Sequence, residues 1–394
     1  MSVYLADLYK NPALSLRLRK PSYKNTFQFN KKHSNMRTTT LENEKIEQFL
    51  SLIPSFPKSV ERSFYEEEKM KLFEALHEKE LQEICGMNKE DSVRIGNIRK
   101  ELTEIVKELL TKKDLDDSFK KYLAIEQEIE NSFLGNQYIY VKQRTLTVKA
   151  LYYHKTENFN KALLFTLEAT ALIEYLIKQG IYTLCTRCFE QNKNISRIYF
   201  ASKQMELGNK TANSLLLYLF NGEYNEGLFG NIFRNNFYWS KNPDVREYFA
   251  HEAFISIVES TVKSNLNNHL DFLPNEWNID LSFGIDNPDR QIISHWISVN
   301  KHLKNGNYEE YFDSLSSFFQ QSYNKHYDIL KIALLIDLTK LVIKLNVENK
   351  ELITEKINEF FNHKISSHKS LYNTWILKQS LYNQARFSLE KSFF

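Results

Sequence analysis

The pattern of apolar and polar positions along the chain is helical over most of its length. In the stretch 150–180, apolar residues recur at helical spacing after Phe159. An apolar segment that ends at Tyr153 precedes them, across the polar break Lys155–Asn158. Small alanines where two helices would cross, with aromatic residues at the turn, let such segments pack closely as an antiparallel hairpin. We take this hairpin as the unit around which the chain is organised.

The same pattern recurs twice further along the chain. Tyr224 follows a break at Asn221-Gly222, and Tyr308 follows a break at Gly306. In each case we expect the aromatic residue to open the second helix of a hairpin. Three hairpins built alike predict an all-α fold, namely an irregular array of α-helical hairpins that is α-solenoid-like.

Few residues interrupt the helical pattern. The 394 residues include 10 Gly and 7 Pro, too few turn residues for a sandwich or barrel of short strands. Asn242-Pro243 and Asn287-Pro288 are typical of helix starts, because Asn caps a helix and Pro fits its first turn. The apolar run 327–345 predicts the most buried helix of the C-terminal half. The short run 138–141 fits a helix or a strand.

The first 40 residues differ in charge from the rest. They hold eight basic residues against Asp7 alone, a net charge of +7, whereas the whole chain has +3. Alternating apolar and polar residues at 14–19 and 25–30 predict a short basic β-ribbon. We therefore divide the chain into a basic N-terminal arm, an N-terminal helical region, a helical-hairpin region and a C-terminal helical region, at residues 1–40, 41–135, 136–265 and 266–394.

The basic arm is a candidate nucleic-acid-binding segment. Its aromatic residues Tyr23, Phe27 and Phe29 could stack on bases while basic side chains contact phosphates. The alternative is that the arm packs its apolar residues on the helical body and leaves its lysines in water. The candidate phosphate contacts are Arg17, Arg19, Lys20, Lys24, Lys31, Lys32 and Arg37.

The first hairpin resembles a known repeat. Ala150, Tyr153, Ala162 and Ala169 fall at the spacings where a tetratricopeptide repeat places small, aromatic, small and small residues. The resemblance covers one hairpin, residues 150–180, and implies an architecture of stacked helix pairs.

Two copies of an Arg-x4-His motif follow the two Asn-Pro helix starts, as Arg246 with His251 and Arg290 with His295. They resemble the signature of the all-α HEPN ribonucleases. That resemblance implies a metal-independent endoribonuclease in which the His moves a proton at the 2′-hydroxyl and the Arg stabilises charge on the phosphate. The alternative is that each Arg pairs with a nearby Asp or Glu, and each His is an interior side chain.

A third resemblance concerns the tract 279–327. It has an apolar helix with Trp296, a break of Asn and Gly, and the aromatic segment Tyr308–Phe312. It is similar to some polymorphic-toxin immunity proteins, and this similarity implies a toxin-neutralising role.

The three cysteines indicate a structural use. Cys185 and Cys188 would share one helix face, which favours packing in a core, and no second CxxC or close His pair accompanies them to bind zinc. We therefore expect no metal site. The chain also lacks the P-loop, dinucleotide, zincin and nucleophile-elbow motifs, so we expect no cofactor. The low cysteine count favours a reducing compartment, and no apolar run approaches the length of a membrane span, so we expect a cytoplasmic protein.

These observations favour a non-enzymatic helical-repeat protein that binds a protein or peptide partner, as a regulator, an adaptor or an immunity protein. An Asn-rich loop of unusual aromatic content supplies the candidate contacts, although the same residues could fill the core. They are Tyr224, Phe229, Phe237, Tyr238 and Trp239. The HEPN-like ribonuclease and nucleic-acid binding through the basic arm are the alternatives.

Overall fold

The structure is a computed structural model of the chain, and it describes residues 37–60, 63–86, 88–111, 114–234, 242–264, 288–345 and 350–365. In these ranges the regular elements are all helices, apart from an isolated bridge between Val60 and Asn324. The predicted all-α fold is therefore confirmed.

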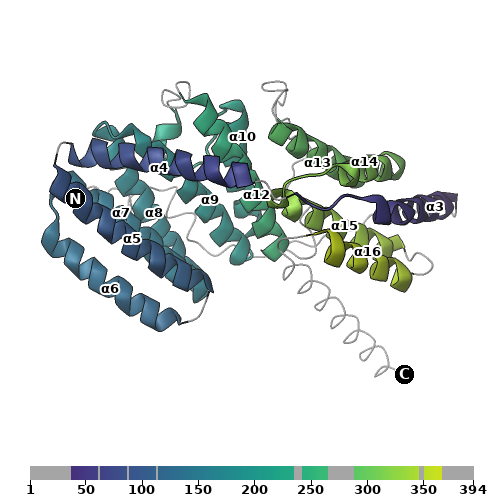
Figure 1. Ribbon diagram of the computed structural model, residues 1–394, viewed down its shortest axis with the longest axis horizontal. Coiled ribbons are helices and arrows are strands. Elements are labelled where there is room, and N and C mark those ends of the chain that lie inside the picture. The colour runs from purple at the N-terminus through teal and green to yellow at the C-terminus, as the bar shows by residue number, and fades with distance from the viewer. Residues whose placement is uncertain are drawn as a thin grey trace. The chain divides into compact units, whose positions relative to one another are not determined.

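Thirteen α-helices and four 3-10 helices make up the described part of the chain (Figure 1). The α-helices are α3 (Arg37–Leu52), α4 (Ser63–Cys85), α5 (Lys89–Thr111), α6 (Leu115–Ser132), α7 (Gly135–Lys155), α8 (Phe159–Lys178), α9 (Cys185–Ala201), α10 (Met205–Asn221), α12 (Pro243–Ser264), α13 (Pro288–Asn305), α14 (Tyr308–Gln320), α15 (Asp328–Leu345) and α16 (Lys350–Lys364). The 3-10 helices are η1 (Ile53–Ser55), η2 (Tyr182–Leu184), η3 (Asn231–Arg234) and η5 (Lys325–Tyr327).

Residues 1–40 and residues 41–394 form separate compact units. The basic β-ribbon expected in the arm lies outside the described residues, as do Arg17, Arg19, Lys20, Lys24, Lys31 and Lys32. Arg37 is the first residue of α3, and its side chain is not among those described.

The hairpin predicted at 150–180 is α7 and α8, which lie side by side (Figure 1). Asn158 caps α8, because its side chain accepts a hydrogen bond from the amide of Lys161 at 3.3 Å. Ala162 and Ala169 are fully buried, so the absence of larger side chains lets the helices approach. Tyr153 stacks on Phe165 with ring centroids 5.4 Å apart.

Four helix junctions of the array share one turn. Glu157, Lys203, Gly180 and Gly306 adopt left-handed conformations, with φ of 60°, 63°, 97° and 75°. In each turn the next amide donates to the carbonyl five residues earlier, at 2.8 to 3.2 Å. This is the Schellman arrangement, which satisfies the last carbonyls of a helix and reverses the chain. The turn at Gly306 joins α13 to α14, and it confirms the hairpin expected there.

The helix expected to begin at Tyr224 is wrong. The left-handed Gly222 ends α10, and no helix follows it before η3. The intervening loop folds back on α10, where a Cβ at Gly227 would lie 1.9 Å from the Ser214 hydroxyl oxygen. Instead, α10 pairs with α9 through the turn at Lys203, which the aromatic pattern does not mark. The ambiguous stretch 138–141 is helical, within α7.

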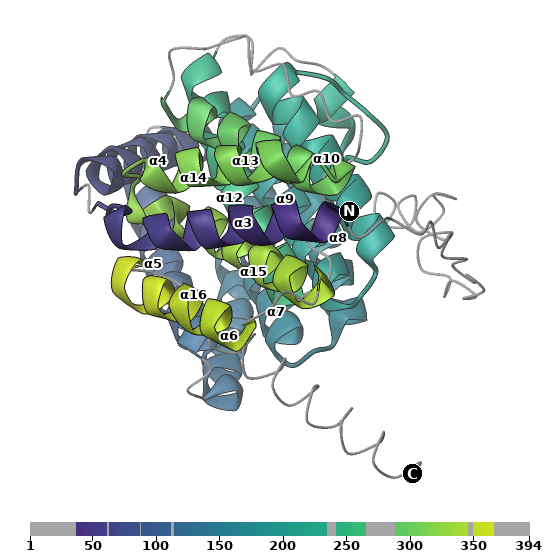
Figure 2. The same cartoon turned by 90° about the vertical axis from the view of Figure 1, so that its right-hand side faces the viewer.

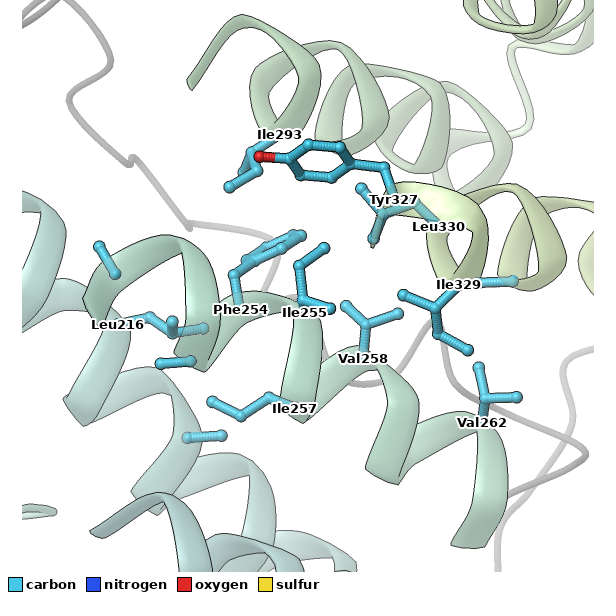
Figure 3. Close-up of a cluster of buried hydrophobic side chains, with 14 of the residues drawn as sticks. Leu216, Phe254, Ile255, Ile257, Val258, Val262, Ile293, Tyr327, Ile329 and Leu330 are labelled. Carbon is cyan, nitrogen blue, oxygen red and sulfur yellow. The ribbon is translucent and has the colours of Figure 1, made fainter. Parts of the chain in front are cut away.

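One hydrophobic cluster extends from Ile46 to Ile365 and includes residues of all three predicted helical regions. The helix α12 packs against α9, α10 and α15, and so joins the hairpins to the C-terminal helices. Figure 3 shows Phe254 and Val258 of α12 facing α13 and α15. The prediction for 327–345 is confirmed, because nearly every described side chain of α15 is buried.

Beyond residue 40, α3 lies between α14 and α16 (Figure 2). Phe49 of α3 contacts Phe319 of α14 at 5.9 Å between ring centroids, and Phe56 contacts Phe360 of α16 at 5.8 Å. The following segment is held by the buried Lys331, whose ammonium group donates to the Ser59 hydroxyl at 3.2 Å. These contacts fasten the start of the described chain to its end.

Among the helices described, none has an apolar stretch long enough to cross a lipid bilayer.

The shared turn generates a stability prediction. A side chain in the left-handed region costs about 1 kcal/mol, which glycine avoids. Glu157→Gly and Lys203→Gly should therefore each raise the free energy of unfolding by up to about 1 kcal/mol. Urea unfolding followed by circular dichroism measures the change. Lys100→Gly, at an exposed helical position of α5, is the control and should lower it by about 1 kcal/mol. A loss of stability in both turn variants would contradict the assigned geometry.

Candidate functional site

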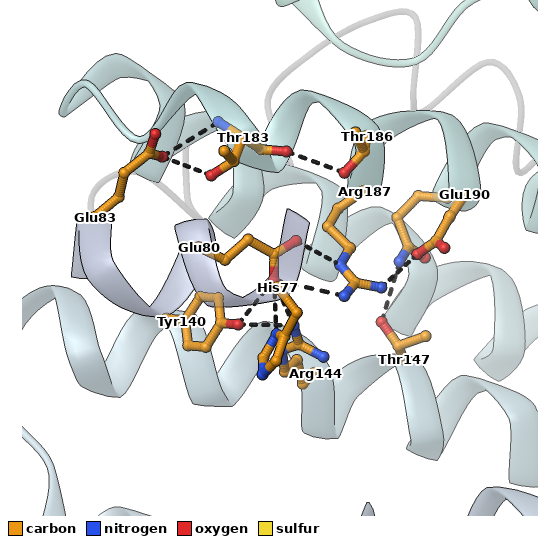
Figure 4. Close-up of polar contacts among 11 residues, drawn as sticks. His77, Glu80, Glu83, Tyr140, Arg144, Thr147, Thr183, Thr186, Arg187 and Glu190 are labelled. Atoms are coloured by element: carbon orange, nitrogen blue, oxygen red, sulfur yellow. Dashed lines mark hydrogen bonds and ion pairs between the residues drawn. The ribbon is translucent and has the colours of Figure 1, made fainter. Parts of the chain in front are cut away.

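A buried carboxylate, Glu80 of α4, lies at the centre of a polar network between three helices (Figure 4). Arg144 of α7 donates to Glu80 Oε2 at 2.6 Å, and Arg187 of α9 donates to Oε1 at 3.2 Å. The Tyr140 hydroxyl donates to Glu80 Oε2 at 2.9 Å. Burial alone would raise the pKa of Glu80, but the charges of Arg187 and Arg144 and the Tyr140 hydrogen bond outweigh it, so the pKa is lowered. The carboxylate is therefore ionised and fully engaged.

Beside this network is a cavity of about 170 Å³ between α5, α7 and α9, which we call the arginine cavity. Three guanidinium groups line it, from Arg99, Arg144 and Arg187, together with Glu190 and the apolar Leu102, Val106 and Val148. Arg187 also donates to Glu190 at 2.8 Å, so that carboxylate is engaged as well.

Arg99 differs from the other two arginines. It is half-buried, and its guanidinium group makes no hydrogen bond or ion pair with any described residue. Burial and then the like charges of Arg144 and Arg187 lower its pKa to about 10, so it remains a cation at neutral pH. The carboxylate of Glu74 attracts Arg99 but forms no ion pair with it. The guanidinium group of Arg99 therefore has no hydrogen-bonded carboxylate, whereas those of Arg144 and Arg187 do.

A second cavity of about 250 Å³ adjoins the first and shares Val106 and Thr147 with it. Its walls come from α5, α7, α8 and α9 and are mostly aliphatic, so we call it the aliphatic cavity. Arg197 of α9 also lines it. The two cavities together form a groove along α5, α7 and α9.

The structure brings together one residue from each Arg-x4-His motif. Arg290 and His251 both contact the carboxylate of Glu247: Arg290 binds it through two nitrogens, and His251 Nε2 lies 3.0 Å from Glu247 Oε1. Arg290 and His251 are buried, with 3% of each residue exposed. The motif residues therefore meet at a carboxylate that belongs to the protein itself.

The remaining two motif residues have other surroundings. Arg246 is half-buried, and its guanidinium group makes no hydrogen bond or ion pair with a described residue. His295 donates from Nε2 to the Ser314 carbonyl at 3.1 Å. Burial lowers the pKa of His295, only partly offset by that hydrogen bond, so its imidazole is neutral at physiological pH.

A further cavity, of about 370 Å³, lies beside α13 and η5 and is lined by Asp289, His295 and His326 among others. His326 Nε2 lies 3.3 Å from Glu252, and Asp289 lies 3.9 Å from His251 Nδ1. Its titratable groups are thus occupied by interactions within the fold.

Two of the candidate partner contacts are described. Phe229 is fixed to α9 by a pair of hydrogen bonds, since its amide donates to the Asn192 side chain at 2.8 Å and its carbonyl accepts from it at 2.9 Å. Tyr224 is half-buried and packs against the main hydrophobic cluster. Phe237, Tyr238 and Trp239 lie outside the described residues.

Cys185 and Cys188 are buried free thiols of the core, as their spacing predicts. Burial, followed by the charge of Glu83, raises the pKa of Cys185 to about 12, so its thiol is protonated and unreactive. In the described part of the chain, no group of three or more His, Cys, Asp or Glu residues is arranged to hold a metal ion.

Sequence reasoning missed the arginines of the groove. Arg187 lies inside the CxxC segment, whose spacing indicates a role for the thiols, and Arg99 lies in a charged tract typical of a solvated helix face. Arg144 lies between Lys142-Gln143 and Lys149 in α7, so no local pattern distinguishes it from the other charged residues of that helix.

Comparison of the chain with models of protein families, with curated proteins and with solved structures gives no significant match. The functional argument therefore depends on the geometry of the groove.

The Glu247 cluster generates a pH prediction. Burial raises the pKa of Glu247, but hydrogen bonds from His251 and Arg290 and their charges lower it to about 2, from an ordinary value of 4.5. Because the folded pKa is the lower one, the stabilisation is complete above pH 4.5 and is lost as pH falls towards 2. Glu247→Gln should cost about 3 kcal/mol of unfolding free energy at pH 7, and less as the pH falls below 4.5.

Urea unfolding at pH 7, 5, 4 and 3 measures this difference. Glu104→Gln is the control, because Glu104 forms an exposed pair with Lys107 at 2.7 Å and should contribute less than about 1 kcal/mol. A Glu247→Gln cost that does not change with pH would contradict the assigned ionisation.

Proposed function

We propose that the chain is a non-enzymatic binding protein whose groove along α5, α7 and α9 takes an acidic segment of a protein or peptide partner. The observation that carries this proposal is the guanidinium group of Arg99, which lines the arginine cavity and makes no hydrogen bond or ion pair with a described residue. A regulator, an adaptor or a toxin-neutralising immunity protein would each use such a groove on an acidic partner.

The charge balance of the cavity favours an anionic ligand. Glu80 and Glu190 already neutralise Arg144 and Arg187 through hydrogen-bonded pairs of 2.6 and 2.8 Å. An arriving carboxylate would meet Arg99 at a half-buried position, where a charge-assisted hydrogen bond is stronger than in water. The guanidinium group is well suited to this, because it can hold both carboxylate oxygens at once.

The neighbouring apolar walls favour a peptide over a simple anion. Leu102, Val106 and Val148 lie beside the arginines in the same cavity, and the aliphatic cavity continues the groove. A peptide with acidic and aliphatic residues in alternation would place the two kinds of side chain in matching surroundings.

The arrangement of the Arg-x4-His residues supports binding over RNA cleavage. Arg290 would have to leave Glu247 before it could hold a phosphate, and both Arg290 and His251 are buried. Breaking a buried ion pair is costly, of the order of 3–5 kcal/mol.

Acidic-peptide binding is testable with a fluorescent peptide of alternating Glu and Leu residues. Fluorescence polarisation should show saturable binding that weakens as salt is raised, because the attraction is between charges. The same peptide with Gln in place of Glu should bind at least about tenfold more weakly.

Arg99→Gln separates a binding role from a structural one. It should weaken binding of the Glu-Leu peptide about tenfold while leaving the melting temperature unchanged or higher, because it removes repulsion with Arg144 and Arg187. Arg94→Gln, on the same helix but bonded to Ser132, is the matched control and should leave peptide affinity unchanged. Equal effects of the two substitutions on binding would refute the assignment of Arg99.

The ribonuclease alternative has its own test. Single-stranded RNA incubated with the protein in EDTA should remain intact, and His251→Ala and His295→Ala should behave as the wild type does. Cleavage by the wild type that is lost in a folded His variant would replace the binding proposal with a HEPN-like reaction. The arm alternative instead predicts salt-sensitive nucleic-acid binding that disappears when residues 1–40 are deleted.

A further inference from the structure

The aliphatic cavity contains an unpaired cation. Arg197 of α9 lines it and makes no hydrogen bond or ion pair with a described residue. Burial lowers the pKa of Arg197, and the carboxylate of Glu259, which is already paired with Lys263, raises it only in part. Placing a guanidinium group where it loses much of its hydration, without an ion pair in return, destabilises the folded state. The presence of an arginine at this position therefore needs an explanation.

A second polar group without a partner lies beside it. Asn194 precedes Arg197 by three residues on α9, so both side chains lie on one helix face, and both line the cavity. The Asn194 side chain forms no hydrogen bond with any described residue. Its amide is therefore available to donate to the same ligand oxygen that Arg197 would attract.

The remaining walls have the opposite character. Val106 and Leu110 of α5, Ala150 and Leu151 of α7 and Ile198 of α9 make most of the exposed lining aliphatic. Leu110 is itself 53% exposed at the rim, unusual for a large apolar side chain. Thr147, His154 and Thr166 complete the walls. The helix face of Arg197 and Asn194 thus suits a negative charge, and the aliphatic lining suits a hydrocarbon chain.

We propose that this cavity binds a small aliphatic monocarboxylate, with the carboxylate on Arg197 and Asn194 and the chain against α5 and α7. A single cation matches a monoanion better than a phosphate dianion. The volume of about 250 Å³ limits the length of the ligand. An apolar cavity of about 150 Å³ accommodates benzene, which has six non-hydrogen atoms, so in proportion this cavity accommodates about ten. Octanoate, with a carboxylate and seven further carbons, has that size.

This site is separate from the acidic-partner site, although the two cavities share Val106 and Thr147. A carboxylate ligand would therefore lie at the edge of the surface offered to the partner. The two proposals depend on different arginines, Arg197 and Arg99, and can fail independently.

The probe is sodium octanoate, titrated into the full-length protein by calorimetry at pH 7.5. We expect one site with a dissociation constant in the submillimolar range. 1-Octanol, which lacks the charge, and acetate, which lacks the chain, should each bind at least tenfold more weakly. Equal affinity for octanoate and 1-octanol would overturn the role of Arg197, and no binding of octanoate at 5 mM would overturn the site.

Arg197→Gln should weaken octanoate binding at least tenfold and leave the melting temperature unchanged or higher, because a half-buried charge without an ion-pair partner is removed. Arg99→Gln is the matched control and should leave octanoate affinity unchanged while it weakens binding of the Glu-Leu peptide. Should Arg197→Gln fail to fold, Leu110→Trp at the exposed rim should block the cavity and weaken octanoate binding at least fivefold. Octanoate binding that survives both substitutions would refute the proposal.

Discussion

The ionised carboxylate of Glu80 is the constraint on which the groove depends. It is buried between α4, α7 and α9, and a single ionised carboxylate in that position needs hydrogen-bonded cations around it. Arg144 and Arg187 supply them from two different helices, and Tyr140 completes the set. The network therefore fixes the spacing and rotation of α7 relative to α9, and with them the walls of both cavities.

This arrangement explains how a protein with a modest net charge of +3 can gather four arginines along one groove. Glu80 stabilises two arginines at the base, and their positive charges then act on Arg99, which the Glu74 carboxylate attracts without forming an ion pair. Arg197 lies further along α9 and is also without a partner. Arg290 is paired with Glu247, whereas Arg99 and Arg197 line cavities without an ion-pair partner among the described residues, and this difference indicates ligands.

The two Arg-x4-His motifs illustrate how a short motif acquires its meaning from packing. The helix starts at Pro243 and Pro288 place Glu247 and Arg290 early in α12 and α13. Because those helices meet near their starts, the arginine of one motif and the histidine of the other reach a shared carboxylate. The same residues would have looked catalytic had the position of Glu247 held a neutral side chain.

The sequence by itself determined the helices, their caps and most of their turns, because these depend on residues within one or two turns of each other. The hairpins at Asn158 and Gly306 and the burial of α15 followed from such local patterns. The turn at Lys203 was not predicted, because the left-handed residue there is a lysine and not a glycine. The helix predicted from Tyr224 was wrong, because the loop that contains Tyr224 folds back on α10. Only the tertiary structure decided which charges are buried and paired. Glu80 is one of many glutamates in its region, and its partners lie 64 and 107 residues away, on helix faces that no local pattern brings together.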